Sequence, residues 1–206
     1  GFNNTASGAL TLYSNTTGSL NTASGAYSLY YNTVGNHNTA YGYQSLKFNT
    51  TGSDNTASGY DALGKNTEGS NNTAYGQQSL FYNTTGFNNT ASGAYSLGAN
   101  ITGSNNTAYG IFSLLSNTTG SYNTAFGYSA KASTVNATNQ TVIGYEATGQ
   151  ADNSVVLGND AVTAVYMGED SGATVYAGGL NLGGTAITSN AAELNYLDGV
   201  TSSIQT

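Results

Sequence analysis

The stretch Asn72-Thr-Ala-Tyr-Gly-Gln-Gln-Ser-Leu-Phe-Tyr-Asn-Thr-Thr-Gly-Phe-Asn88 is one unit of a repeat of 17 residues. A short fixed period is typical of one supersecondary unit stacked on itself, so the sequence predicts a solenoid rather than a globular domain. A degenerate copy of the opening motif occurs at Thr141-Val-Ile-Gly144. The full motif, Asn-Thr-Ala-x-Gly, begins without gaps at Asn4, Asn21, Asn38, Asn55, Asn72, Asn89, Asn106 and Asn123.

Each repeat has two halves, and each half ends in glycine, as at Gly76 and Gly86. Neither half has helical periodicity, and Thr, Tyr and Gly are poor helix formers. Short strands broken by glycine turns fit better, because glycine adopts positive φ without steric cost. We therefore predict an all-β fold: a parallel β-roll, or β-solenoid, with two short strands in each 17-residue coil, every strand pairing with its equivalent one repeat later.

One leucine recurs in phase with the repeat, which disordered low-complexity sequence has no reason to maintain. This column is the predicted core of the coil. Its members are Leu12, Leu29, Leu46, Leu63, Leu80, Leu97 and Leu114.

An alanine column allows two interpretations: a tight corner of the coil, or a flat strip that forms a subunit interface. A coil this narrow encloses little apolar surface, so we expect an obligate oligomer, and homotrimers suit fibres. The candidate interface consists of Ala6, Ala23, Ala40, Ala57, Ala74, Ala91, Ala108 and Ala125.

Asparagine forms two further columns, one from Asn4 to Asn123 and one from Asn15 to Asn117. Asparagine hydrogen-bonds its own turn and stacks into amide ladders in parallel register. The second column also spells Asn-x-Thr glycosylation sequons, for example at Asn49 and Asn83. Turn chemistry alone accounts for these asparagines, so we favour ladders over a glycan coat.

The pattern changes toward the C-terminus. The second glycine column, whose last member is Gly120, is lost beyond Gly127, and the spacing from Gly144 to Gly158 shortens to 14 residues. We expect larger side chains to close a tapering roll there. The predicted segments are a β-roll over 1–150, shorter tapering repeats over 151–178, and a connector over 179–206.

A short helix is expected within the connector, at Ser189-Asn-Ala-Ala-Glu-Leu-Asn-Tyr-Leu197. Ser189 or Asn190 would cap it, Glu193 lies in its first turn, and Asp198-Gly199 ends it. Because the chain starts and stops in mid-pattern, we expect it to be a segment of a longer protein.

Composition excludes several functions. Charged residues are 6% of the chain, against about 25% in typical domains. The net charge is −7 with three cations, so nucleic acid is not an expected partner. No apolar run of about 20 residues predicts membrane insertion. Without cysteine or a calcium-binding repeat, and with a lone His37 for which we expect no Asp or Cys partner, we expect no enzyme, metal or other cofactor.

Two stretches resemble known families. Asn153-Ser-Val-Val-Leu-Gly158, with its 14-residue step, is similar to the repeat of trimeric autotransporter adhesin heads, and the 17-residue units resemble a longer variant of it. That resemblance implies left-handed parallel β-rolls assembled as trimers. The stretch from Leu180 to Val200 resembles a linker common in bacteriophage tail fibres.

The function we expect is a structural and adhesive segment of a phage tail fibre that presents, or contributes to, host-receptor binding. The alternative is a bacterial cell-surface adhesin head that binds glycans or matrix. Ice binding through the threonine column is a weaker third possibility, since the residue two positions later varies. Aromatic side chains at variable positions could stack on sugars or pack between subunits; these are Tyr13, Tyr30, Tyr31, Phe48, Phe81, Tyr82, Tyr95 and Phe112.

Overall fold

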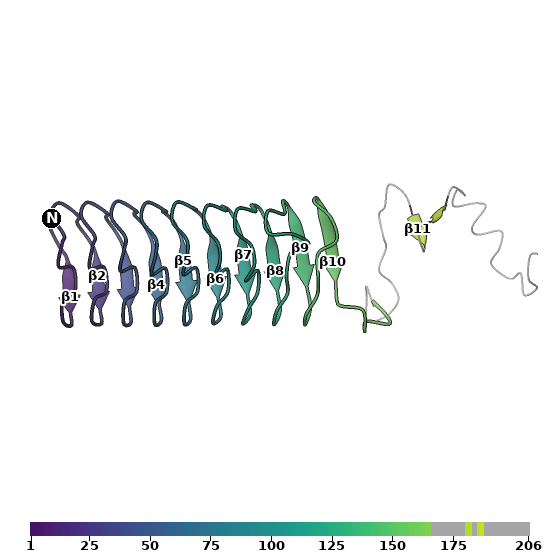
Figure 1. Ribbon diagram of the computed structural model, residues 1–206, viewed down its shortest axis with the longest axis horizontal. Coiled ribbons are helices and arrows are strands. Elements are labelled where there is room, and N and C mark those ends of the chain that lie inside the picture. Colours follow the sequence, from purple (N-terminus) through teal and green to yellow (C-terminus); the bar gives the residue numbers. More distant parts are fainter. Residues whose placement is uncertain (166–179, 183–184, 188–206) are drawn as a thin grey trace, which may run out of the picture. The chain divides into compact units, whose positions relative to one another are not determined.

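The computed structural model describes residues 1–165, together with 180–182 and 185–187. Internal contacts divide the chain into two units, Gly1–Thr163 and Ala164–Thr206. The division falls inside the predicted 151–178 segment. Within the first unit, Figure 1 shows the strands side by side along one axis, each contributed by one coil.

The first unit is a parallel β-solenoid, as the repeat predicts. Its ten strands form one sheet in chain order, and equivalent residues of successive repeats pair with each other, as Thr73 does with Thr90. The strands are β1 (Thr5–Ser7), β2 (Thr22–Ser24), β3 (Thr39–Tyr41), β4 (Thr56–Ser58), β5 (Thr73–Tyr75), β6 (Thr90–Ser92), β7 (Thr107–Tyr109), β8 (Thr124–Phe126), β9 (Gln140–Ile143) and β10 (Ser154–Leu157).

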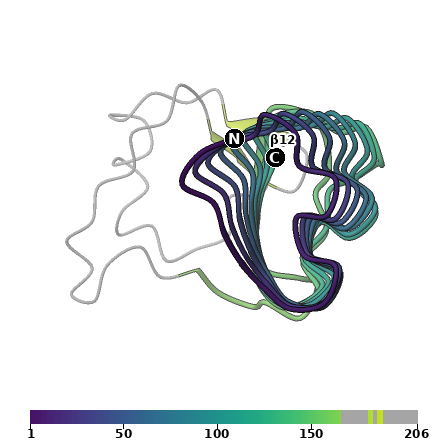
Figure 2. The same cartoon turned by 90° about the vertical axis from the view of Figure 1, so that its left-hand side faces the viewer.

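Each coil has one strand rather than the two that the sequence predicted. In the second half of a coil, residues with positive φ interrupt the extended backbone, for example Gln78 (52°) and Leu80 (51°). This half still bonds to the next coil, since the Leu80 N–H donates to the Ser96 carbonyl at 3.0 Å. Figure 2 shows the result in cross-section, with one nearly straight side formed by the strands and one indented side formed by turns.

The leucine column lies in the core, where the sequence places it. Leu29, Leu46, Leu63, Leu80, Leu97 and Leu114 are at most 1% exposed, and Leu12, in the first coil, is partly buried against the same cluster.

The alanine column also lies in the core, which corrects the expectation that it forms a subunit interface. Successive side chains of a strand point to opposite faces, and in each strand alanine points into the coil. Its side chain is therefore covered by the chain's own residues and is not available to a partner. Ala23, Ala40, Ala57, Ala74, Ala91, Ala108 and Ala125 are all 0% exposed, and Ala6, in the first coil, is exposed.

Two buried asparagine ladders complete the interior. In the first, the backbone N–H of each asparagine donates to the Oδ1 atom of the asparagine one coil earlier, at 2.9–3.0 Å, from Asn4 to Asn123. In the second, Nδ2 donates to the preceding Oδ1 at 2.8–2.9 Å, from Asn15 to Asn117. The sequon asparagines Asn49 and Asn83 are 0% exposed, so the folded chain offers them to no glycan.

The glycines that follow the second ladder are required by space. A Cβ atom on Gly86 would overlap the Oδ1 atom of Asn83 and the carbonyl oxygen of Gly103. The same overlap recurs at Gly52 and Gly69. This column of glycines therefore lets the second half of each coil lie against the ladder.

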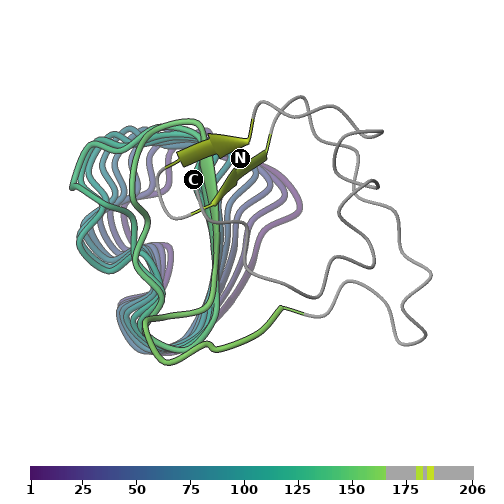
Figure 3. The same cartoon turned by 90° about the vertical axis from the view of Figure 1, so that its right-hand side faces the viewer.

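The coil changes where the repeat does. Gln140 and Val142 replace the asparagine and alanine of the earlier motif, and both are fully buried. β10 pairs with β9 across the shorter step, with Val156 opposite Val142. Figure 3 views the solenoid from this end.

In the second unit, β11 (Leu180–Leu182) and β12 (Thr185–Ile187) form an antiparallel pair. These strands lie in the segment that the sequence predicted to be a connector. The predicted helix at 189–197 lies outside the described residues.

Candidate functional site

The outer sheet face is the first candidate binding surface. It consists of the side chains that flank each alanine of the strands, and threonine forms one of its two columns. Its second column alternates between small and large residues: Ser24, Tyr41, Ser58, Tyr75, Ser92 and Tyr109. The tyrosines are about half exposed, at 48–53%. None of these residues is charged.

Toward the C-terminus the second column of the outer sheet face becomes continuously apolar. Phe126 and Ile143 follow Tyr109 in the same column, and β10 adds Val155 and Leu157. Val155 is 66% exposed and Leu157 47%. The rings of Tyr109 and Phe126 stack 4.8 Å apart at an angle of 5°. Contiguous exposed apolar residues are a feature of interaction surfaces in general, so this end of the face is a candidate contact surface.

The turn face, on the other side of the coil, contains the aromatic residues that the sequence analysis proposed as sugar or subunit contacts. Tyr13, Tyr31 and Tyr82 are exposed, whereas Tyr30, Phe48, Phe81, Tyr95 and Phe112 are half-buried. The half-buried rings pack against aromatic neighbours of the same chain. Stacked pairs with centroids 5.2–5.4 Å apart are Tyr13–Tyr30, Tyr31–Phe48 and Tyr95–Phe112.

Two lysines lie among these rings. Lys65 Nζ is 4.6 Å from the ring centroid of Phe48, and Lys47 Nζ is 5.1 Å from the same centroid. Asp61 is nearby and only 8% exposed. Burial raises the pKa of its carboxyl group, against the opposing effects of a hydrogen bond from Gln78 and of the charges of Lys47 and Lys65.

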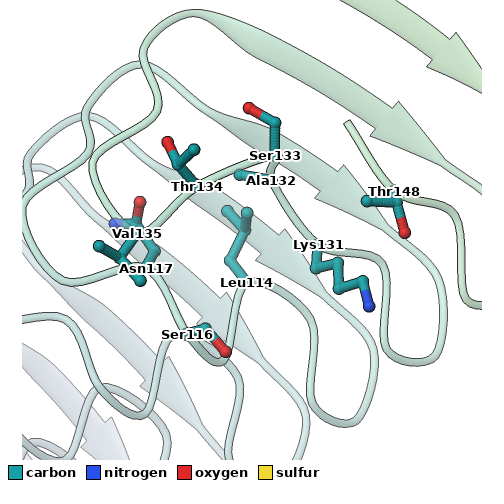
Figure 4. A pocket seen from close by; sticks show the side chains of 9 residues that line it. All are labelled: Leu114, Ser116, Asn117, Lys131, Ala132, Ser133, Thr134, Val135 and Thr148. Carbon is teal, nitrogen blue, oxygen red and sulfur yellow. The ribbon is translucent and has the colours of Figure 1, made fainter. Parts of the chain in front are cut away.

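A cavity of about 310 Å³ lies where the 17-residue pattern breaks, between the coils of β7, β8 and β9. Figure 4 shows Leu114 at its base, Asn117 on one side, and Ser133, Thr134 and Thr148 around it. Lys131 lies at the rim with its side chain extended away from Asn117 (Figure 4). Sequence reasoning missed this cavity, although the loss of leucine and asparagine in the repeat that begins at Asn123 was a readable signal.

His37 has a partner that sequence reasoning did not find. Its Nδ1 atom lies 3.6 Å from Asp54 Oδ1, one coil later, and both side chains are 55% exposed. In the part of the chain that the structure describes, no group of three His, Asp or Glu side chains is arranged to hold a metal ion. In the same part of the chain, no helix has the length and apolarity of a membrane span.

Comparison with protein-family models, with curated proteins and with solved structures finds no match to this chain. The fold itself defines the class of the protein, which is a parallel β-solenoid of 17-residue coils.

Proposed function

We propose that the chain is a homotrimeric segment of a bacteriophage tail fibre, which holds or contributes to the host-receptor-binding part of the fibre. It acts without catalysis or cofactor. Its partners are its own copies and a cell-surface glycan or other receptor, rather than nucleic acid or the membrane interior. Its location is the virion, outside the cell.

The outer sheet face carries this proposal. The strip is uncharged, runs along all ten strands, and exposes Tyr41, Tyr75, Tyr109, Phe126 and Leu157. The end of this strip from Tyr109 to Leu157 is contiguous and apolar, and exposed apolar patches of this kind are costly in water and favour a partner that covers them. A further copy of the chain offers the same coil spacing of about 4.8 Å, which lets contacts repeat in register along the axis.

A trimer covers such a strip economically. The outer sheet face is only two side chains wide. Two copies packed face to face would leave the edges of this face exposed to solvent, whereas three copies that direct the face toward a common threefold axis bury it. At each level the axis would then meet three threonines and three residues of the alternating column. Levels with Ser58 leave room for the rings of Tyr41 and Tyr75 above and below. The subunit interface proposed here is therefore formed by the residues on either side of each alanine in the strands, and not by the alanines.

The alternative is a bacterial cell-surface head in which the turn face binds glycans or matrix. The exposed rings of Tyr31 and Tyr82 favour it, because aromatic rings with a hydroxyl suit sugar contacts. The similarity of the stretch from Leu180 to Val200 to phage tail-fibre linkers supports the first proposal instead.

Gold-labelled antibodies raised against residues 1–163 distinguish the two by electron microscopy. Labelling along the tail fibres of phage particles released from the source culture supports the phage proposal. Labelling of the bacterial envelope in cells that release no phage supports the adhesin, and labelling confined to the cytoplasm contradicts both.

A further inference from the structure

The turn face contains a hollow of about 110 Å³ between the coils of β5, β6 and β7. It lies beside Gly98, which follows Phe81 at one repeat in a column of mostly large side chains. Gly64, one repeat before Phe81, leaves no such space, because the Phe81 ring covers it: a Cβ atom on Gly64 would lie 2.9 Å from Phe81 Cε2. At Gly98 the next coil supplies Leu115 in place of a ring, so the hollow stays open.

The lining of the hollow is accessible and largely apolar. Tyr82 is 55% exposed. The half-buried members of the lining are Phe81, Tyr95, Ala99 and Leu115. Whole drug-sized ligands need roughly 300 Å³ or more, so a space this small takes one apolar group, such as a methyl or isopropyl group. The hollow is therefore a subsite for one substituent of a larger molecule.

A cation lies next to this hollow. Lys65 is exposed, and its Nζ atom lies 6.0 Å from the ring centroid of Phe81, which lines the hollow. Within residues 1–165 Lys65 forms no ion pair. Asp61 lies nearby but is only 8% exposed and accepts a hydrogen bond from Gln78, so the ammonium group stays open to solvent. An exposed cation beside an apolar hollow favours a ligand that carries both a negative charge and a small apolar group.

The backbone around the hollow favours a sugar over a peptide. An extended peptide binds by pairing with unbonded N–H and C=O groups at the edge of a sheet. Here those groups already pair between coils, since the Tyr82 N–H donates to the Gly98 carbonyl oxygen and the Ala99 N–H to that of Leu115, both at 3.1 Å. Tyr82 instead offers an exposed ring with a hydroxyl group, which suits the apolar face and the hydroxyl groups of a sugar.

We propose that the hollow and Lys65 together bind one terminal N-acylated acidic sugar, of the sialic-acid class. The acyl methyl group enters the hollow beside Gly98, the carboxylate pairs with the Lys65 ammonium group, and the sugar lies over Tyr82. This inference rests on the proposed function, since it names the receptor chemistry of the fibre. The site lies within one chain and on the turn face, so a trimer joined through the outer sheet face leaves it open.

Saturation-transfer-difference NMR titrations of residues 1–206 test the site with three probes. The first is the methyl glycoside of N-acetylneuraminate. The second is methyl N-acetylglucosaminide, which has the acyl group without the charge, and the third is N-acetyl-leucine, which has a carboxylate and an apolar group without a sugar ring. We expect saturable binding of the first, with a dissociation constant lower by roughly tenfold than those of the other two, because each of these lacks one contact.

Two variants locate the contacts, each with a matched control. Ala99→Tyr should abolish sialoside binding and keep the fold, because it fills the hollow with the residue that Tyr82 supplies one coil earlier. Ser14→Tyr, at the equivalent position of the first coil, should bind like the unaltered chain. Lys65→Gln should weaken sialoside binding by roughly tenfold and leave binding of the neutral sugar unchanged, whereas Lys131→Gln should change neither.

Three results would overturn the proposal. Absence of sialoside binding by a chain that sediments as a trimer would remove the site and leave the fibre standing. Equal binding of N-acetyl-leucine would make the hollow a contact for a peptide side chain. Full sialoside binding by Ala99→Tyr, with circular dichroism showing an intact fold, would place the ligand elsewhere. Selective sialoside binding by a chain that sediments as a monomer would support the site and contradict the trimer.

Discussion

The Nδ2 atom of Asn83 lies 2.8 Å from the Oδ1 atom of Asn66, one coil earlier, and both side chains are 0% exposed. The same Nδ2 atom also donates to the Gly86 carbonyl oxygen at 2.9 Å. One amide group therefore closes its own turn and joins it to the preceding coil. In a coil whose apolar core is little more than one leucine and one alanine, these paired polar groups provide much of the specificity of stacking.

Asn83→Ala should destabilise the fold by about 2 kcal/mol or more, because it leaves the buried Asn66 Oδ1 atom without a donor. Chemical denaturation monitored by circular dichroism measures the change. Thr85→Ala, at an exposed position of the same coil, is the control and should stay within about 0.5 kcal/mol of the unaltered chain. Equal stability of the two variants would show that the ladder contributes nothing.

Leu80 combines a fully buried side chain with a left-handed backbone, at φ 51°, so substitutions there test core packing and backbone strain separately. Leu80→Ala should cost about 2–5 kcal/mol for the lost core contacts. Leu80→Gly should be more stable than Leu80→Ala by about 1 kcal/mol, because glycine avoids the strain of a left-handed backbone. Ala74→Gly, in a strand, should instead lose about 0.5–1 kcal/mol. If the glycine variant at position 80 is the weaker of its pair in thermal denaturation, the backbone assignment there is wrong.

Gly86 and Gly98 form a matched pair for the effect of an added methyl group. Gly86→Ala should cost about 3 kcal/mol or more, since the new Cβ overlaps a backbone carbonyl that cannot move alone. At Gly98 the nearest atoms are the Tyr95 carbonyl oxygen at 3.0 Å and Leu115 Cδ1 at 3.1 Å, and the leucine can turn away. Gly98→Ala should therefore cost less than Gly86→Ala in urea unfolding, and the reverse order would contradict the packing described.

Asp61 should make stability depend on pH. Because burial raises the pKa of its carboxyl group, the folded chain holds the proton more tightly than the unfolded chain. The contribution of the Asp61 carboxyl group to stability is therefore fully present at pH values below its pKa in the unfolded chain. This contribution is lost as the pH rises through its higher pKa in the folded chain. Asp61→Asn should raise the melting temperature at pH 7, and the gain should vanish near about pH 3.

Asp54→Asn is the control for that experiment, because the Asp54 side chain is 55% exposed. Its melting temperature should follow that of the unaltered chain at both pH values. A gain for Asp61→Asn that persists unchanged at low pH would assign the effect to packing rather than to charge.

The proposed trimer predicts different effects for two exposed tyrosines. Tyr75→Glu, on the outer sheet face, should dissociate the assembly, because three carboxylates would meet near the axis without partners. Tyr82→Glu, on the turn face, should leave the assembly intact, although Tyr82 is the more exposed at 55% against 49%. Light scattering after size-exclusion chromatography reads out both, and dissociation by Tyr82→Glu alone would place the interface on the turn face.

The sequence predicts the stacking direction, the coil length and the leucine core because these follow from period alone. It did not predict which strand face points inward, since a column of alanines such as Ala74 suits both a narrow interior and a close subunit contact. The second predicted strand failed for a different reason. Positive φ at Leu80 and Gln78 is imposed by the closed coil and contradicts the preferences of those residues.

The cavity shows the same limit. The replacements of leucine by Lys131 and of asparagine by Thr134 are visible in the sequence, but their consequence depends on how far the shorter coil of β9 reaches over them. The partner of His37 was readable in principle, because Asp54 follows it at one repeat.

The solution mass of residues 1–206 tests the central claim most directly. Sedimentation equilibrium should give a particle of three chains, each of 20.9 kDa, that holds together on dilution. Circular dichroism of the same sample should show that this particle is rich in β structure. A stable folded monomer would contradict the account, because the outer sheet face would then stand uncovered in water.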